Sequence, residues 1–469
     1  MPPDRFRLVV IGLDSVSPDI LIRRFASVTP NLQRLLSESA RGPLMSCDPP
    51  ITVPAWSVMF SGMDPGSLGL YGFRHRRPGS YDRMYTPTSA TPRHPMVWHE
   101  LSRTGHKVAV LGMPPGYPPP AVNGVSISDF LTPASASDWV HPGTLRPEIE
   151  RVAGGPFFDV AVRGADRDRA AREILEMTRR RWKVARELWR RERWDLFVIH
   201  DIGPDRIHHA FWKYFDRDHP RFEPDSPYAT VASDFYALLD QEIGAFLAGV
   251  DDSVTVAVVS DHGSQAMRGC FCINEWLIRE GYLALRRPPP AAGTPIEACE
   301  VDWTSTRVWG AGGYYARLFV NLRGREAHGI VEPEEFPQLV EELRARLATV
   351  QRPSGVPLEV RLFAPGDVYR RVEGDPPDLM AYFDGTACRS AGTLGHRRLF
   401  LEENDTGPDD AVHSFDGLIA WREAGGGRSG ILPPQRILDV GPTIIRRFGG
   451  VLSPTLQGRP IPELLLEKD

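Results

Sequence analysis

The sequence predicts an α/β fold in which a doubly wound, mostly parallel sheet carries helices on both faces. Three short apolar runs support this prediction, since each has the length and composition of a strand buried on both faces. These runs span residues 8–13, 194–200 and 254–259. Helical segments separate them, and such alternation favours parallel strands joined by crossover helices. The 469 residues, 42% of them hydrophobic, are sufficient for a large core.

The first half of the chain supplies further strands and helices in the same pattern. A helix is expected to begin near Pro30, where leucines follow at helical spacing, and a strand is expected at 42–46. Residues 97–113 indicate a helix and then a strand. Residues 134–166 show weak periodicity and are interpreted as an excursion from the core, in the position of a lid. Residues 167–194 are typical of a long amphipathic helix with a charged outer face.

The character of the sequence changes after residue 270, which predicts two units. The predicted catalytic core comprises residues 1–270 and 377–469, and residues 271–376 form a smaller inserted or cap subdomain. Short aromatic strands within 302–323 and a helix at 333–350 are the main elements expected in the insertion.

Composition and charge exclude several classes of protein. The formal net charge of −5 argues against a general nucleic-acid binder, which has a basic excess. The five cysteines show neither a disulfide framework nor zinc-finger spacing. No run of 18 apolar residues occurs, and the first apolar run is too short for a signal peptide. We therefore expect a cytoplasmic protein without a membrane span.

Acidic residues follow the predicted parallel strands at their carboxyl ends. Asp14 follows the first strand, Asp201 and Asp205 follow the second, and the pair Asp261 and His262 follows the third. Ligands of open α/β sheets bind at this edge. Taken alone, Asp14 is equally well explained as a helix cap. Taken together, these side chains are expected to share one crevice.

Histidines join these acids in a pattern typical of metal ligands. Asp205 and His209 are four residues apart and share one face of a helix. The adjacent residues Asp261 and His262 point in opposite directions from a strand, so they can serve two neighbouring ions. His413 offers another imidazole. This mixed nitrogen and oxygen set predicts divalent metal ions, with Zn²⁺ favoured and Mn²⁺ or Fe²⁺ as alternatives.

Thr52 is the candidate nucleophile. Its hydroxyl stands between Pro50 and Pro54, ahead of an apolar helix whose amino terminus would favour an anion. A threonine hydroxyl is protonated at neutral pH, and a bound metal favours its alkoxide form. A second ion would neutralise the leaving oxygen of an in-line displacement. Position alone leaves open the alternative that Thr52 simply caps the helix.

The ordered set of motifs resembles the alkaline phosphatase superfamily, and within it the type I phosphodiesterase/nucleotide pyrophosphatase branch. In chain order, the matching segments are 10–14 (VIGLD), 50–56 (PITVPAW), 61–66 (SGMDPG), 205–209 (DRIHH), 260–263 (SDHG), His413, 437–443 (ILDVGPT) and 458–460 (GRP). The resemblance covers nearly the whole chain and implies an alkaline-phosphatase-like fold with an inserted smaller subdomain.

The resemblance also implies roles for the site residues. Thr52 would form a phosphorylated enzyme intermediate. Two divalent metal ions are implied, one held by Asp14, Thr52, Asp261 and His262 and the other by Asp205, His209 and His413. The implied activity is hydrolysis of phosphate diesters or pyrophosphate-type bonds in a small phosphate ester or nucleotide-like substrate. The alternatives are a phosphomonoesterase or phosphoglycerate-mutase-like enzyme of the same superfamily, and a non-catalytic binding homologue.

One segment departs from the family pattern. Nucleotide pyrophosphatases of this branch commonly carry an asparagine downstream of the nucleophile that contacts the phosphoryl oxygen, and Phe73 stands about where it would be. Contact with the phosphoryl group is therefore assigned to Arg74, His75 or the backbone amide of Val53, and Phe73 is counted with these three as a candidate substrate-binding residue. This departure leaves the specificity for nucleotides open.

Several other residues compete with these assignments. His208 is the alternative to His209, Asp201 to Asp205, and His396 to His413. Four aromatic residues are interpreted as core or rim packing, with stacking on a flat leaving group as the alternative: Trp303, Trp309, Tyr314 and Tyr315.

Overall fold

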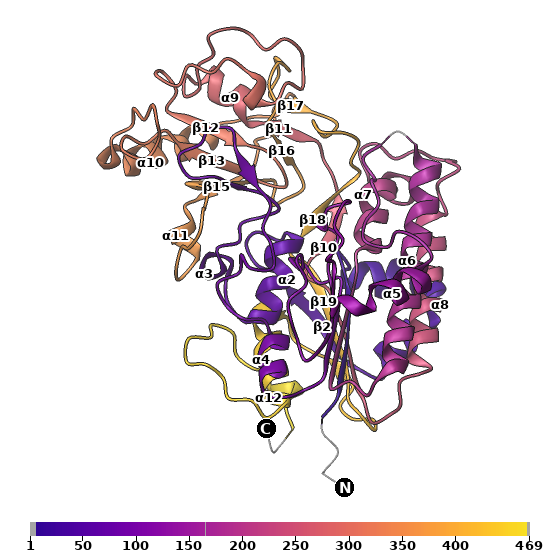
Figure 1. The fold of residues 1–469 in the computed structure, drawn as a ribbon. Helices are drawn as coiled ribbons and strands as arrows, with labels where there is room; N and C mark the ends of the chain where they lie inside the picture. Colours follow the sequence, from indigo (N-terminus) through magenta and orange to yellow (C-terminus); the bar gives the residue numbers. More distant parts are fainter. Residues whose placement is uncertain (1–5, 165, 467–469) are drawn as a thin grey trace.

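The computed structural model describes residues 6–164 and 166–466, and its centre is a ten-stranded sheet (Figure 1). In spatial order the strands are β20 (Gly430–Ile431), β2 (Ala40–Met45), β19 (Asp416–Arg422), β9 (Thr255–Val259), β1 (Leu8–Leu13), β8 (Leu196–Asp201), β5 (Val108–Leu111), β6 (Gly124–Ile127) and β7 (Val140–His141), and β21 (Gln435–Arg436) also pairs with β2. The five strands from β9 to β6 are parallel to one another, whereas β19 and β7 on either side of them are antiparallel. The predicted fold class is therefore confirmed.

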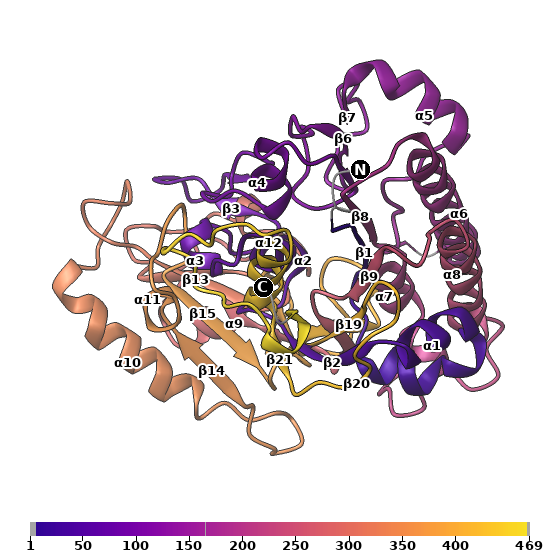
Figure 2. The same ribbon diagram turned by 90° about the horizontal axis from the view of Figure 1, so that it is seen from below.

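Helices cover both faces of this sheet (Figure 2). One face carries α1 (Pro30–Ser37), α5 (Arg146–Ala153), α6 (Arg167–Arg191), α7 (Gly203–Phe215) and α8 (Val231–Leu247). The other face carries α2 (Thr52–Ser61), α4 (Val97–Arg103) and α12 (Val440–Arg447), and the short α3 (Pro65–Leu68) follows α2.

The alternating side chains of β1 explain why helices are needed on both faces. Val9, Ile11 and Leu13 belong to the apolar core beneath α6 and α8, whereas Leu8 and Val10 belong to the core beneath α2 and α12. A strand with apolar residues on both faces must bury both, which the sequence signals as a continuous apolar run.

A smaller part of the molecule lies beyond the carboxyl ends of the central strands (Figure 1). One sheet has the order β12 (Val308–Ala311), β13 (Ala316–Val320), β15 (Leu379–Phe383) and β14 (Val360–Phe363). A second has the order β16 (Arg389–Ala391), β11 (Cys270–Cys272) and β17 (Phe400–Leu401), and the helices are α9 (Ile273–Arg279), α10 (Phe336–Leu347) and α11 (Pro365–Val368). Apart from α11 and β16, these elements contribute to a separate apolar core.

Two further pairs of strands complete the fold. β3 (His75–Arg76) pairs with β4 (Met84–Tyr85), and β10 (Gly263–Ala266) pairs with β18 (Ala411–Ser414). The second pair joins the segment after β9 to the segment before β19.

The sheet topology corrects one sequence-based expectation. Residues 377–383 are predicted to return the chain to the catalytic core, but β15 pairs with β13 and β14 in the smaller sheet. Its apolar run fits a buried strand of either sheet, so composition does not distinguish the two. The excursion at 134–166 contains β7 and α5, and α5 packs beside α6. The division into a core and an inserted subdomain stays a prediction.

None of the helices in the described part of the chain combines the length and apolar character that crossing a membrane requires.

The contact between Gly12 and Trp56 gives a test of how tightly β1 and α2 are packed. A Cβ at Gly12 would lie 2.7 Å from the rigid, fully buried Trp56 ring. We expect Gly12→Ala to lower the free energy of unfolding by about 1–3 kcal/mol, because the indole must move. Urea denaturation measures this loss. The matched control is Gly143→Ala, where an added Cβ meets nothing within 4 Å. Equal stability of the two variants would contradict the expected crowding.

Candidate functional site

The parallel strands bring the predicted acids to one edge of the sheet. Asp14 follows β1, and Asp261 follows β9 beside it. Asp205 lies in the first turn of α7, which begins immediately after β8. Thr52 is the first residue of α2. The pairing of β18 with β10 sets His413 opposite Ser264 and so completes the cluster.

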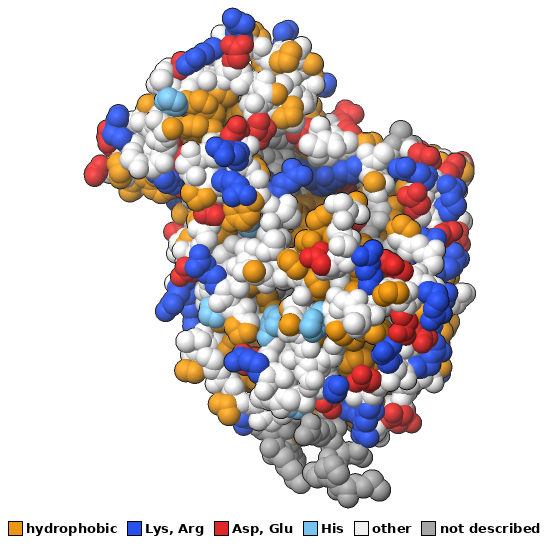
Figure 3. Space-filling view, viewed as in Figure 1, with side chains coloured by type: hydrophobic (Ala, Val, Ile, Leu, Met, Phe, Trp, Pro, Cys, Tyr) orange, Lys and Arg blue, Asp and Glu red, His pale blue; other side chains and the backbone are white. Residues whose placement is uncertain are grey.

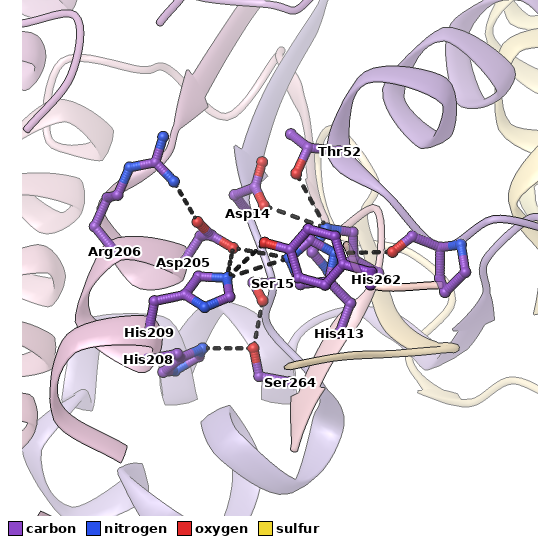
Figure 4. A network of polar contacts seen from close by, with 12 residues as sticks. Asp14, Ser15, Thr52, Asp205, Arg206, His208, His209, His262, Ser264 and His413 are labelled. Atoms are coloured by element: carbon purple, nitrogen blue, oxygen red, sulfur yellow. Dashed lines mark hydrogen bonds and ion pairs between the residues drawn. The ribbon is translucent and has the colours of Figure 1, made fainter. Parts of the chain in front are cut away.

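A first group of side chains is centred on His262, toward which the Thr52 hydroxyl points (Figure 4). The Nε2 atom of His262 lies 3.3 Å from Thr52 Oγ1, 3.1 Å from Asp261 Oδ2 and 3.5 Å from Asp14 Oδ1. All four residues are buried. The structure thus brings together the four residues that the sequence analysis groups as ligands of one ion.

A second group lies beside the first. Asp205 Oδ1 is 3.2 Å from His209 Nε2 and 3.3 Å from His413 Nε2, and the two imidazole nitrogens are 3.3 Å apart. The rings of His262 and His413 stack with their centroids 3.7 Å apart, so His262 stands between the two groups. The ligand atoms of Asp205, His262 and His413 lie within 4.8 Å of one another, as do those of Asp14, Asp261 and His262.

The chemistry of this donor set fits divalent metal ions. Three buried carboxylate oxygens have no hydrogen-bond partner: Asp14 Oδ1, Asp205 Oδ1 and Asp261 Oδ2. Burial and the neighbouring Asp14 carboxylate raise the pKa of Asp261 well above its usual value. Burial lowers the pKa of His262 to about 3, so its imidazole is neutral, the form that binds metals. Buried, unpartnered carboxylates are costly without a cation.

Residues that the sequence analysis missed hold Asp14 and His209 in place. Asp14 Oδ2 accepts a hydrogen bond from Trp56 Nε1 at 3.0 Å and lies 2.8 Å from His200 Nε2. His209 Nδ1 lies 2.6 Å from Asp409 Oδ1. In each case one atom of the candidate ligand is fixed while the other faces the cluster. Such outer contacts orient metal ligands.

The carboxylate of Asp409 is itself held by two arginines. Its Oδ2 atom accepts from Arg389 at 2.9 Å and from Arg163 at 3.0 Å. In the sequence, Asp409 is marked only by its pairing with Asp410 immediately before β18. That pair does not by itself predict a contact with His209.

The competing residues have other partners. His208 lies between Ser264 Oγ and the Tyr236 hydroxyl, at 3.0 Å from each. The two oxygens of Asp201 accept from Trp182 Nε1 and from the backbone of Gly203. The side chain of His396 contacts Thr393 Oγ1 at 2.8 Å. None of these three residues belongs to the two ligand groups found among the described residues.

A cavity of about 910 Å³ opens beside the second ligand group and reaches His209. Phe73 and Arg74 line it, as the sequence analysis expects of substrate contacts. His75 is buried and does not line the cavity. Its Nε2 atom accepts a hydrogen bond from the backbone N–H of Tyr71 at 2.8 Å. Val53 is in the first turn of α2, where backbone N–H groups lack acceptors within the helix. The contact roles of all four residues stay predictions.

Tyr314 is the residue through which the smaller four-stranded sheet contacts the site. It lies between β12 and β13, its hydroxyl is 3.1 Å from His209 Nε2, and its ring stacks on His413 at 3.9 Å between centroids. The interpretation of Tyr314 as ordinary core or rim packing is therefore incomplete, because its hydroxyl reaches a candidate metal ligand.

Comparison with known proteins gives the family and the fold of the chain. The model of the type I phosphodiesterase/nucleotide pyrophosphatase family matches residues 8–387. A search of curated protein sequences gives no match. Among solved structures, phosphonoacetate hydrolase from Sinorhizobium meliloti 1021 in complex with phosphonoacetate superimposes with a TM-score of 0.59 at 14% identity, covering 95% of this chain and 96% of that one. An inactive murine ectonucleotide pyrophosphatase/phosphodiesterase 5 in complex with AMP gives 0.55 at 10% identity, covering 96% of each chain.

The Asp409 contact gives a test of how His209 is oriented. We expect Asp409→Asn to weaken divalent metal binding about 10–100-fold, because an outer carboxylate fixes the ring and raises its basicity. Metal content after dialysis against buffers of defined free Zn²⁺ measures this change. Asp416→Asn is the matched control, since Asp416 is exposed on β19. Unchanged metal affinity in Asp409→Asn would show that the contact does not orient a metal ligand.

Proposed function

The chain belongs to the type I phosphodiesterase/nucleotide pyrophosphatase family, and from this we propose that it hydrolyses phosphate diesters or pyrophosphate-type bonds through a threonyl-phosphate intermediate. The observation that carries the proposal is the buried Thr52 hydroxyl, which lies 3.3 Å from His262 Nε2. The same nitrogen lies 3.1 Å from Asp261 Oδ2 and 3.5 Å from Asp14 Oδ1, two buried oxygens that accept no hydrogen bond. In this proposal the hydroxyl is a nucleophile that bound cations activate, and it is not a helix cap. In agreement, the N-cap of α2 is Ile51, so Thr52 is the first residue within the helix and not its cap.

In the first step, Thr52 Oγ1 forms a bond to phosphorus while the bond to the leaving oxygen breaks. In the second step, water forms a bond to the same phosphorus and the Thr52 ester breaks. The start of α2 favours the anionic phosphoryl group, because the N–H groups of its first turn are free of helical acceptors. The burial of the site strengthens each electrostatic contact by excluding water.

In this proposal two divalent ions are held by the residues already described. Asp14, Thr52, Asp261 and His262 would hold one, and Asp205, His209 and His413 the other. When bound, the ions supply charge that favours an ionised Thr52 and neutralises the leaving oxygen. The mixed imidazole and carboxylate donors favour Zn²⁺, with Mn²⁺ as the alternative.

The proposed substrate is a small phosphate ester or a nucleotide-like molecule. The cavity beside His209 has the size of a small-molecule site. Phe73 lines this cavity in place of a polar side chain, which leaves the choice between mono- and diesters to experiment. A cytoplasmic location stays part of the proposal, and the five unpaired cysteines are compatible with it.

Removal of the Thr52 hydroxyl tests the nucleophile. We expect Thr52→Val, which keeps the side-chain shape, to lower kcat for bis-p-nitrophenyl phosphate on the order of 10³-fold or more, because no group is left to accept the phosphoryl. Thr52→Ser should retain measurable turnover.

Mass spectrometry of acid-quenched wild-type enzyme should locate a phosphoryl ester on the peptide that contains Thr52. Undiminished hydrolysis by Thr52→Val would sink the assignment of Thr52 as nucleophile, whatever metal the protein carries.

Removal of metal tests the ligand groups. A chelator that strips the protein should abolish hydrolysis and lower its thermal stability, because a cation bound at 100 times its Kd contributes about 2.7 kcal/mol to folding. Addition of Zn²⁺ or Mn²⁺ should restore both properties. Full activity in protein shown by elemental analysis to be free of metal would refute the two-metal mechanism.

A further inference from the structure

The cavity beside the candidate metal site is basic, although the chain as a whole is acidic. Six arginines line it: Arg74, Arg163, Arg169, Arg206, Arg317 and Arg389. Only three acidic residues line it, whereas the chain has a net charge of −5. Figure 3 shows lysine and arginine side chains gathered along the hollow between the smaller and larger parts of the molecule.

Four of these arginines are paired with carboxylates. Arg163 and Arg389 hold Asp409, Arg206 pairs with Asp159 and Asp205, and Arg169 is 3.9 Å from Glu173. Their charges are thus balanced within the protein, and they can be explained as structural.

Arg74 and Arg317 differ from the other four. Across residues 6–164 and 166–466, neither forms an ion pair with a carboxylate. Arg317, which lies on β13, donates instead to the backbone carbonyls of Arg74 at 2.6 Å and Gly312 at 3.2 Å. These contacts fix the guanidinium at the cavity wall without neutralising it.

The position of Arg317 is electrostatically unfavourable without a further partner. Burial lowers its pKa, and the positive charge of Arg74 lowers it further. Arg74 is exposed and lies on the segment between α3 and β3, so the two cations come from different parts of the molecule. Two adjacent cations without an anion repel each other, and a bound anion would relieve that repulsion.

We propose that Arg74 and Arg317 form an anion subsite for a second acidic group on the substrate. The preferred substrate is then a small phosphate ester whose non-reacting part carries a further phosphate, phosphonate, sulfonate or carboxylate. The same cavity reaches His209 of the second ligand group, so a substrate bound there could contact both sites. The role of the subsite in turnover therefore rests on the proposed function. Guanidinium groups suit such anions, since their planar N–H donors bind two oxygens at once.

Equilibrium binding tests the subsite without any need for turnover. The probes are alkyl phosphonates that end in a sulfonate, compared by calorimetry with alkyl phosphonates of the same length that end in a methyl group. The sulfonate is a permanent anion and a poor zinc ligand. On zinc-loaded wild-type protein, we expect the sulfonate probe of the best length to bind at least about ten-fold more tightly.

Charge variants assign that preference to the two arginines. In this subsite Arg74 contacts the second anion, and the phosphoryl contact falls to the other residue groups named for it. Arg74→Glu and Arg317→Ala should therefore remove the preference for the sulfonate and leave the affinity of the methyl-terminated probe unchanged. Arg317→Lys should retain part of it. Arg77→Glu is the matched control, because Arg77 is exposed only three residues after Arg74 but does not line the cavity. Arg74→Glu alters only an exposed side chain, so it keeps the test valid if Arg317→Ala does not fold.

Two results would overturn the subsite. One is equal affinity of wild-type protein for the two probe series at every chain length. The other is equal weakening of both probes by Arg74→Glu, which would indicate only a general electrostatic effect. Persistent hydrolysis by Thr52→Val would refute the proposed mechanism but would leave this binding result unaffected, so the two failures are distinguishable.

Discussion

The structure depends on a concentration of negative charge at the carboxyl edge of the central sheet. Asp14, Asp205 and Asp261 are buried and close together, and each has an oxygen that accepts no hydrogen bond and faces an imidazole of the site. Parallel pairing of β1 with β8 and β9 makes this crowding unavoidable, since all three strands end at the same edge. In a low-dielectric interior such repulsion is costly, and cations bound at this edge would relieve it.

The surrounding residues can be understood as a response to this charge. Trp56 and His200 each contact one oxygen of Asp14 and leave the other free. On the second group, Asp409 contacts the outer nitrogen of His209, and two arginines balance Asp409 in turn. The inner atoms remain available to ligands while the outer ones are fixed.

The sequence was sufficient for features that depend on local pattern. The strands β1, β8 and β9 are continuous apolar runs, and Asp14 and Asp261 follow from the rule that parallel strands end together. Asp409 and His200 were not predicted, because their roles come from contacts with residues distant in the chain. The return of the chain at 377 was misplaced for a related reason. The pairing partner of β15 decides which sheet it joins, and composition does not reveal the partner.

The position of β19 has a consequence for how the protein is made. This strand, near the end of the chain, lies inside the large sheet between β2 and β9. During synthesis on a ribosome, β2 and β9 are complete long before their shared neighbour emerges, so each has an open hydrogen-bonding edge for that time. His413 precedes β19 by only a few residues. The last strand of the sheet interior and the last imidazole of the site therefore arrive together, and an incomplete chain has neither.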